Sequence, residues 1–128
     1  MQFITQIDIE KYKDVVIGEI RSDVLVLTDN QCEHIIKRRG ESFYAKYHKY
    51  FHVIAEDPDF IFADSSHENT AIACKSFEEG SKSINLVIKL AIVGDDIELE
   101  NSIITAVVEN EKRYRQRLRN KIPLYKKE

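Results

Sequence analysis

A small set of side chains in this sequence could together move a proton and hold a phosphate. His34 is followed one helical turn later by Arg38, and Lys75, Ser102 and Thr105 come further along the chain. An imidazole can take or give a proton, while cations and hydroxyls stabilise a charged phosphorane. These are the groups that cleavage of RNA through its own 2'-hydroxyl needs. Spacing alone does not show that they meet.

Each candidate also has an ordinary structural explanation. His34 could be a residue at the border of a helix, and Lys75 could be a solvated lysine on a strand. Thr105 could be present because branched side chains favour strands. The residues therefore define a hypothesis about a site, and the elements that carry them decide whether the site can exist.

The sequence lacks the usual signatures of cofactor or metal chemistry. It contains no GxGxxG, P-loop, HExxH, paired CxxC or nucleophile elbow. His48 and His52 have the spacing of two ligands on one helical face, but no third ligand accompanies them, so a surface pair is favoured. We therefore expect no metal and no cofactor.

Length and composition are typical of one soluble domain spanning residues 1–128, with 43% apolar and 32% charged residues. No apolar run approaches the roughly 20 residues that cross a bilayer, and the N-terminus lacks the pattern of a secretory signal. Cys32 and Cys74 have no CxxC spacing and favour reduced, buried thiols over a disulfide. These features predict a cytoplasmic protein without a membrane partner.

Charge is strongly segregated along the chain. Residues 112–128 contain eight basic residues and one acid, or +7, so the remainder carries −10 of the total of −3. Counterion release depends on local charge, so such a strip could contact phosphates. We expect a basic C-terminal arm at 110–128 in which Arg113, Arg115 and Arg117 bind RNA. A solvated basic helix, or a strip that binds an acidic protein, fits the composition equally well.

Local signals predict two helices in the first half of the chain. Thr28 and Gln31 have the form of a capping box and Gly40 follows a basic pair, so we expect a helix over 29–39 that carries His34, Arg38 and Arg39. A second helix is expected from Ser42 to the turn at 57–59, with aromatic residues at spacings of three and four. This aromatic helix should cover the sheet.

The rest of the chain predicts most of a sheet. Strands are expected over 14–20, 23–28, 59–63, 70–77, 83–93 and 101–109, with a short edge strand around 122–125. Short turns between them, such as the one at 78–82, imply an antiparallel meander. The predicted fold class is α+β, an antiparallel sheet of about four to five strands with two N-terminal helices packed on one face.

The order of these segments resembles a known group of nucleases. The helix EHIIKRR with His34, the turn DPDFIFAD, the strand IACK with Lys75 and the segment NSIITA with Thr105 follow one another along the chain. In this order they resemble the phage-associated barnase, EndoU, colicin and RelE-like nuclease domains, over about residues 22–127. The resemblance implies a bacterial or phage-encoded domain of barnase-like or RelE-like fold.

The resemblance also implies an activity and roles for residues. It suggests a metal-independent endoribonuclease of phage or toxin type that leaves a 2',3'-cyclic phosphate, with His34 as general acid or base and Thr105 near the scissile phosphate. Lys75 and Arg38 would contact the phosphate, with Arg39 and Ser102 as further RNA contacts. The expected partner is RNA, with tRNA and mRNA as candidates, and an inhibitor or immunity protein is a candidate second partner.

One departure from the family keeps an alternative open. The body of the chain is acidic, and the basic tail replaces the evenly basic face expected of a free-standing ribonuclease. The alternative is a catalytically inactive phage or toxin-system accessory domain that binds nucleic acid or an acidic protein through its C-terminal arm. The enzyme hypothesis requires His34, Lys75 and Thr105 to line one cleft.

Overall fold

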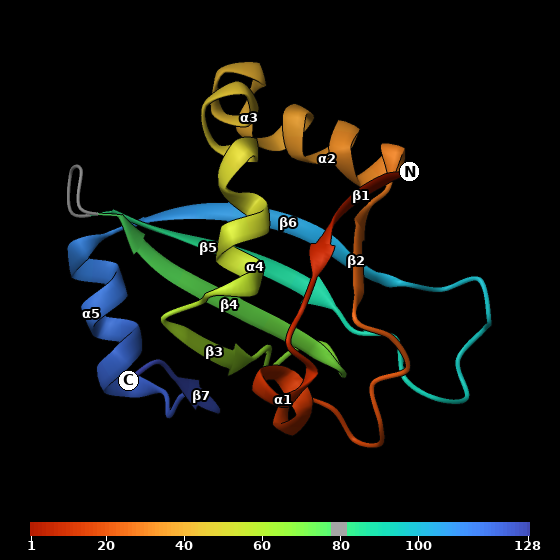
Figure 1. The fold of residues 1–128 in the computed structure, drawn as a ribbon. Coiled ribbons are helices and arrows are strands. Elements are labelled where there is room, and N and C mark those ends of the chain that lie inside the picture. The colour runs from red at the N-terminus through yellow and green to blue at the C-terminus, as the bar shows by residue number, and fades with distance from the viewer. Residues whose placement is uncertain (78–81) are drawn as a thin grey trace.

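The computed structural model describes residues 1–77 and 82–128 and has an α+β fold built on one mixed sheet of seven strands (Figure 1). The strands are β1 (Gln2–Gln6), β2 (Val24–Leu27), β3 (Phe60–Ala63), β4 (Thr70–Phe77), β5 (Lys82–Lys89), β6 (Asn101–Asn110) and β7 (Tyr125–Lys126). Their order across the sheet is β1-β2-β6-β5-β4-β3-β7. The helices are α1 (Ile9–Tyr12), α2 (Asp29–Arg39), α3 (Glu41–Tyr47), α4 (Phe51–Glu56) and α5 (Glu111–Asn120), with 3₁₀ turns η1 (Lys13–Val15) and η2 (His48–Tyr50).

The central strands β3 to β6 form the expected antiparallel meander. At one side of this meander, β2 pairs with β6 in parallel over two residues, which the sequence did not suggest. Asn101, at the start of β6, holds this junction together: its amide nitrogen donates to the carbonyls of Ser22 and Val24, and its oxygen accepts from the backbone of Ala91. The side chain is fully buried, so these bonds connect three segments inside the protein.

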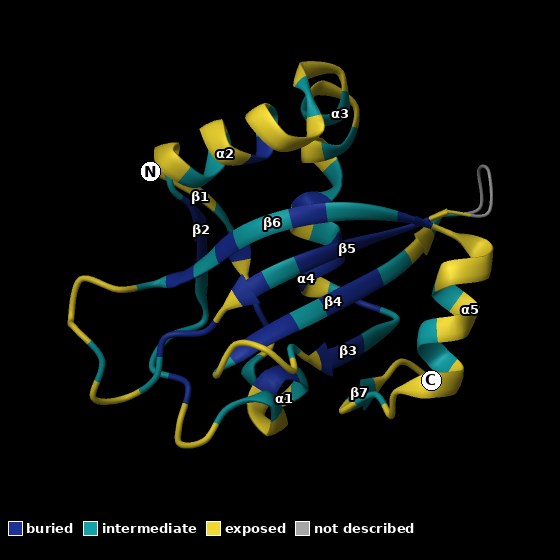
Figure 2. Ribbon diagram, turned by 180° about the vertical axis from the view of Figure 1, so that it is seen from behind, coloured by how far each residue is buried: buried dark blue, intermediate teal, exposed yellow. Residues whose placement is uncertain are grey.

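Helices pack against one face of the sheet and leave the centre of the other face uncovered. Side chains alternate along a strand, so Ala71 and Ala73 of β4 face the helices while Ile72 faces the other side. On β5, Leu86 and Ile88 pack against α4 in the core. Figure 1 shows α4 crossing this face, whereas no helix crosses the central strands in the view from behind (Figure 2). We call the second side the open face; it contains Ile72, Asn85, Val87, Thr105, Val107 and Glu109.

The aromatic helix is interrupted. The sequence predicts one helix from Ser42, but α3 and α4 are separated by the 3₁₀ turn η2. A 3₁₀ turn changes the phase of the helix, so side chains after it point in a different direction. Phe51 and Ile54 of α4 are consequently buried against the sheet, while the aromatic rings of α3 are only half-buried. The expectation that this segment covers the sheet is confirmed for α4.

The first strand is the clearest error of prediction. Residues 14–20 were expected to form it, but the structure places β1 at Gln2–Gln6 and a 3₁₀ turn at Lys13–Val15. The sheet has seven strands where about four to five were expected. The short edge strand predicted around 122–125 is present as β7, whereas β1 was not predicted. The predicted turn at 78–82 lies largely outside the described residues. Within residues 1–77 and 82–128, no helix has the length and apolarity to cross a membrane.

Candidate functional site

A cleft of about 570 Å³ lies on the open face between α2, the loop after β3, the start of β4, the end of β5 and the middle of β6. It contains four nitrogen-bearing side chains, two carboxylates and three hydroxyls. Its walls are formed by His34, Arg38, Asp64, Ser66, His67, Glu68, Thr70, Val87, Lys89, Ile104 and Thr105. We call this the histidine cleft.

Helix α2 positions His34 and Arg38. Thr28 caps its first turn by accepting a hydrogen bond from the backbone of Gln31, as the capping box predicts. Ile35 is fully buried and anchors the helix along the outer edge of β6, where no strand pairs beyond Ser102. With Ile35 facing inward, His34 and Arg38 lie one turn apart on the exposed side that borders the cleft.

Arg39 and Ser102, both expected to contact RNA, lie beside the cleft rather than in its wall. Arg39 Nε donates to the carbonyl of Ala106 at 3.1 Å, which satisfies an edge acceptor of β6 that lacks a strand partner. Ser102 pairs with Lys89 across the β5–β6 ladder and so points to the open face. Arg39 therefore has a structural role that the sequence analysis missed.

Thr105 lines the histidine cleft, as predicted. A shift of register between Val87 and Ile88 inserts Ile104 into β6, and this bulge brings Ile104 and Thr105 together into the wall. The Thr105 hydroxyl is buried and has no hydrogen-bond partner within residues 1–77 and 82–128. An unsatisfied buried hydroxyl is costly, which makes this position a candidate for function over stability.

The structure adds His67, which the sequence analysis did not select. His67 lies in the loop between β3 and β4, and its Nδ1 is 3.5 Å from Asp64 Oδ1. The backbone N–H of Ser66 also donates to that carboxylate, and these contacts together hold the pKa of Asp64 below its usual value despite partial desolvation. The ionised carboxylate orients the imidazole through Nδ1, so Nε2 is the nitrogen available to a substrate.

Lys89 provides the lysine of the cleft. It stands at the end of β5, and its Nζ donates to the backbone carbonyl of Glu68 at 2.8 Å. This bond ties the loop that carries His67 to the sheet. With Arg38 and Lys89 opposed by Asp64 and Glu68, the cleft gains net positive charge only when an imidazole is protonated.

Lys75 does not join this cleft, which corrects the predicted arrangement. It shares the helix-covered side of β4 with Ala71 and Ala73, opposite to the open face. Its Nζ donates to the carbonyl of Asp57 at 2.8 Å and to the Asp57 carboxylate at 3.2 Å, and its side chain is 15% exposed. Lys75 is therefore committed to the turn that follows α4, and the condition that all three residues share one cleft is not met.

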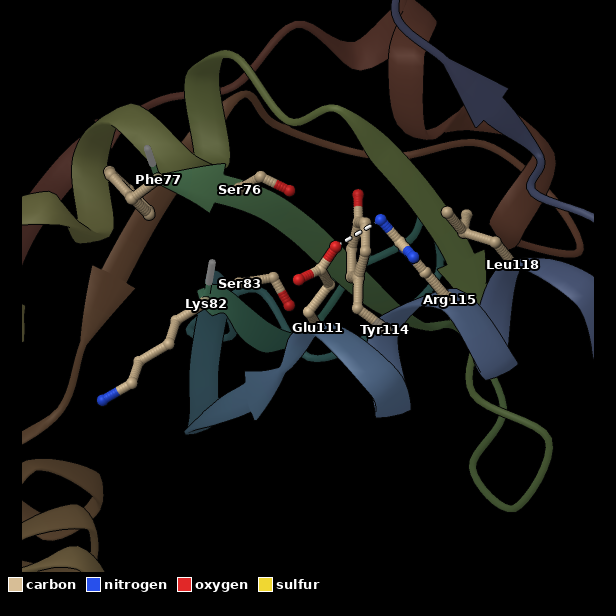
Figure 3. A pocket seen from close by; sticks show the side chains of 8 residues that line it. All are labelled: Ser76, Phe77, Lys82, Ser83, Glu111, Tyr114, Arg115 and Leu118. Atoms are coloured by element: carbon tan, nitrogen blue, oxygen red, sulfur yellow. Dashed lines mark ion pairs between the residues drawn. The ribbon is translucent and has the colours of Figure 1, made fainter. Parts of the chain in front are cut away.

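The basic arm begins with the helix α5. Asn110 caps α5, and β7 then returns to pair with β3 at the edge of the sheet. Arg113 is exposed beside the open face, whereas Arg115 points back along the helix to an ion pair with Glu111 (Figure 3). Arg117 contacts Glu109 at 3.0 Å and lies 6.0 Å from the ring centre of Phe62. The three arginines that were predicted as one strip thus have different environments.

His48 and His52 are both exposed, as the favoured prediction of a surface pair requires. Because η2 intervenes between α3 and α4, His48 and His52 do not share one continuous α-helix. His48 Nδ1 is 2.7 Å from the carbonyl of Tyr44, and His52 lies 3.8 Å from Glu56. Within the described ranges, no group of three or more His, Cys, Asp or Glu residues could hold a metal ion.

Comparisons with protein-family models, curated proteins and solved structures gave no match to this chain.

Proposed function

We propose that this protein cleaves RNA at the histidine cleft without a metal ion, by attack of the 2'-hydroxyl on the neighbouring phosphate. The observation that supports this most strongly is the convergence of His34 and His67, from α2 and from a loop, on one cleft with Arg38 and Lys89. The proposal retains His34 and Thr105 from the sequence hypothesis. It replaces Lys75 by His67 and Lys89.

The reaction requires two proton transfers and stabilisation of one phosphorane. One imidazole takes the proton of the 2'-hydroxyl as its oxygen attacks phosphorus, and the P–O5' bond breaks as the other imidazolium protonates the leaving oxygen. The products are a 2',3'-cyclic phosphate and a free 5'-hydroxyl. Each imidazole ends in the protonation state in which the other began, so a later proton exchange with water restores the site.

The remaining residues of the cleft have roles in binding charge. Arg38 can form paired hydrogen bonds with the non-bridging phosphate oxygens, while Lys89 supplies a point charge from the sheet. Thr105 offers a hydroxyl without another partner among the described residues. These groups would stabilise the extra negative charge of the phosphorane more than that of the ground state.

The test is cleavage of a labelled RNA by purified protein in the presence of EDTA. We expect cyclic-phosphate ends, and a fall of about 100-fold or more in rate for His34→Ala and for His67→Ala. The matched control is His52→Ala, which removes an exposed histidine on α4 whose contact is Glu56. This control should cleave at the wild-type rate.

Two results would contradict the proposal. The first is an absence of cleavage by folded wild-type protein on both structured and unstructured RNA. The second is undiminished cleavage by both cleft variants, which would mean that another site or a contaminant is responsible. Circular dichroism of each variant separates loss of chemistry from loss of fold.

Binding without turnover is a second candidate function, favoured by the outer side of α5. Lys112, Arg115 and Arg119 surround a surface hollow there with a single carboxylate, Glu111. Such a surface suits an acidic protein partner. If this function is correct, an acidic partner binds to wild-type protein, the triple substitution of these cations by Gln abolishes binding, and His34→Ala has no effect.

A further inference from the structure

We infer that the groove between α5 and the open face is a second subsite, which holds the neighbouring nucleotides of a single RNA strand whose scissile phosphate lies in the histidine cleft. This inference rests on the proposed function and names the part of the substrate that the cleft does not hold. The groove has a volume of about 420 Å³. It is lined by Ile72, Asn85, Val87, Val107, Glu109, Arg113, Gln116, Arg117, Asn120 and Lys121.

The groove and the histidine cleft are adjacent parts of one surface. Val87 of β5 lines both, and its cross-strand partner Thr105 lies in the histidine cleft. Two residues further along β6, on the same face, Val107 lies in the groove. A strand bound with one phosphate near Thr105 can therefore continue over Val87 without leaving the open face.

Helix α5 divides its polar residues between two sides. Arg113, Arg117 and Lys121 recur at intervals of four and face the groove, with Gln116 and Asn120 between them. Lys112, Arg115 and Arg119 lie on the outer side instead. Because Arg117 is paired with the buried Glu109, the groove side has Arg113 and Lys121 left to contact phosphates.

The floor of the groove contains an acceptor without a donor. Asn85 is 2% exposed, and its amide nitrogen donates to the Glu109 carboxylate. Its carbonyl oxygen is buried and forms no hydrogen bond within residues 1–77 and 82–128. Folded proteins seldom leave such an oxygen unpaired, so a ligand N–H is its natural partner. An unpaired nucleobase carries N–H donors on its edge and can be inserted between apolar side chains such as Ile72 and Val107.

This arrangement favours a single strand over a duplex. In an RNA duplex the donor-bearing base edges are already paired, and they cannot reach a side chain at the bottom of a groove. The apolar residues on the floor also offer contact to the face of an unstacked base. The groove thus combines two exposed cations, Arg113 and Lys121, with an apolar floor. Proteins that bind single-stranded nucleic acids likewise combine cations with surfaces on which bases pack.

The experiment measures binding without relying on cleavage. Fluorescently labelled 2'-O-methyl RNA lacks the attacking hydroxyl, so its anisotropy reports affinity even if the protein cuts RNA. Oligomers of about four and about twelve nucleotides span the range of common single-strand sites. We expect wild-type protein to bind the longer oligomer more tightly than the shorter one. It should bind a duplex of the longer sequence more weakly than the corresponding single strand.

Two double variants with the same change of charge locate the subsite. Arg113→Gln with Lys121→Gln should remove the advantage of the longer oligomer and reduce the slope of log affinity against log salt by about 1.4, or about 0.7 for each lost phosphate contact. Lys112→Gln with Arg119→Gln, on the outer side, should leave the preference for the longer oligomer and the salt slope unchanged. Asn85→Leu tests the floor: it should weaken single-strand binding while the salt slope stays at the wild-type value.

The outcomes separate this inference from the proposed function. Equal loss from the two double variants, or equal binding of duplex and single strand, would overturn the subsite. If Asn85→Leu does not fold, the charge variants still decide, because their substitutions lie at exposed positions. Tight, groove-dependent binding without any cleavage of natural RNA would support the subsite and contradict the ribonuclease.

Discussion

The Lys75 ammonium donates a hydrogen bond to the backbone carbonyl of Asp57 and a second one to its carboxylate, and it lies 3.9 Å from Asp59. Asp57 is the C-cap residue that follows the end of α4 at Glu56, and β3 begins shortly after it. A lysine on the neighbouring strand β4 therefore fixes the turn between the helix that covers the sheet and the strand that follows. Lys75 thus has a structural role on the covered face, whereas the histidine cleft lies on the other face.

Replacing Lys75 by Met should weaken the fold and leave the chemistry intact. The substitution keeps the length of the apolar stem and removes hydrogen bonds from a charged donor, so we expect a loss of about 1–2 kcal/mol in the free energy of unfolding. Cleavage at a temperature where the variant is folded should match the wild type. Urea unfolding measures the stability of the variant, and the RNA assay measures its rate of cleavage. A large loss of cleavage by folded Lys75→Met protein would instead show that Lys75 takes part in the reaction.

The same turn should make stability sensitive to acid. Lys127 and then Lys75 hold the pKa of Asp57 below its ordinary value of 3.8. A carboxyl group with a lowered folded-state pKa stabilises the protein above the unfolded-state value, and that contribution is lost as the pH falls through the folded-state value. Wild-type protein should therefore lose stability below about pH 4 through this group. Asp57→Asn should show a shallower loss in urea midpoints measured between neutral pH and pH 3.

The sheet alternation shows which part of the site was predictable. Lys75 follows Ala71 and Ala73 at intervals of two, and those alanines are core residues. Because side chains two residues apart on a strand share a face, this spacing places the lysine on the covered face. His34 and Thr105 do line one cleft, and the position of His34 follows from helix α2, whose bounds have strong sequence signals. His67 could not be found in this way, because it lies in a loop whose path is set by contacts such as that between Lys89 and Glu68.

The edges of the sheet were less predictable than its centre. Strand propensity depends on neighbouring strands, and residues 14–20 have the branched side chains of a strand without forming one. In contrast, β1 is a polar-looking segment that pairs with β2 through contacts at long range. The parallel pairing of β2 with β6 depends on Asn101, whose three hydrogen bonds have no local sequence signal.

Asn101→Leu should be among the most destabilising single substitutions at a polar position. Leucine has a similar branched shape but leaves the backbone N–H of Ala91 and the carbonyls of Ser22 and Val24 without their partner. Unsatisfied buried groups cost about 1–3 kcal/mol each, and partial access to water limits the sum, so we expect a loss of about 3 kcal/mol. Urea unfolding measures it. A change below about 0.5 kcal/mol would show that this junction is not essential to the fold.

Thr105→Val should raise the stability of the protein while lowering its rate of RNA cleavage. The Thr105 hydroxyl is buried without a hydrogen-bond partner among the described residues, so a methyl group in its place removes a desolvated polar atom from a strand. We expect the free energy of unfolding to rise by about 1 kcal/mol, because burial of an unpaired hydroxyl is unfavourable and valine also favours strands. If that hydroxyl contacts the phosphate, RNA cleavage should nevertheless fall by about tenfold, the loss expected for one hydrogen bond.

The control for this substitution is Thr70→Val in the same cleft. Thr70 Oγ1 donates to the carbonyl of Glu68 at 3.0 Å, so its removal breaks an existing bond in the loop that carries His67. Thr70→Val should therefore be less stable than wild type, by about 1 kcal/mol. A Thr105→Val protein that is both more stable and fully active would show that the unpaired hydroxyl is not used for phosphate binding.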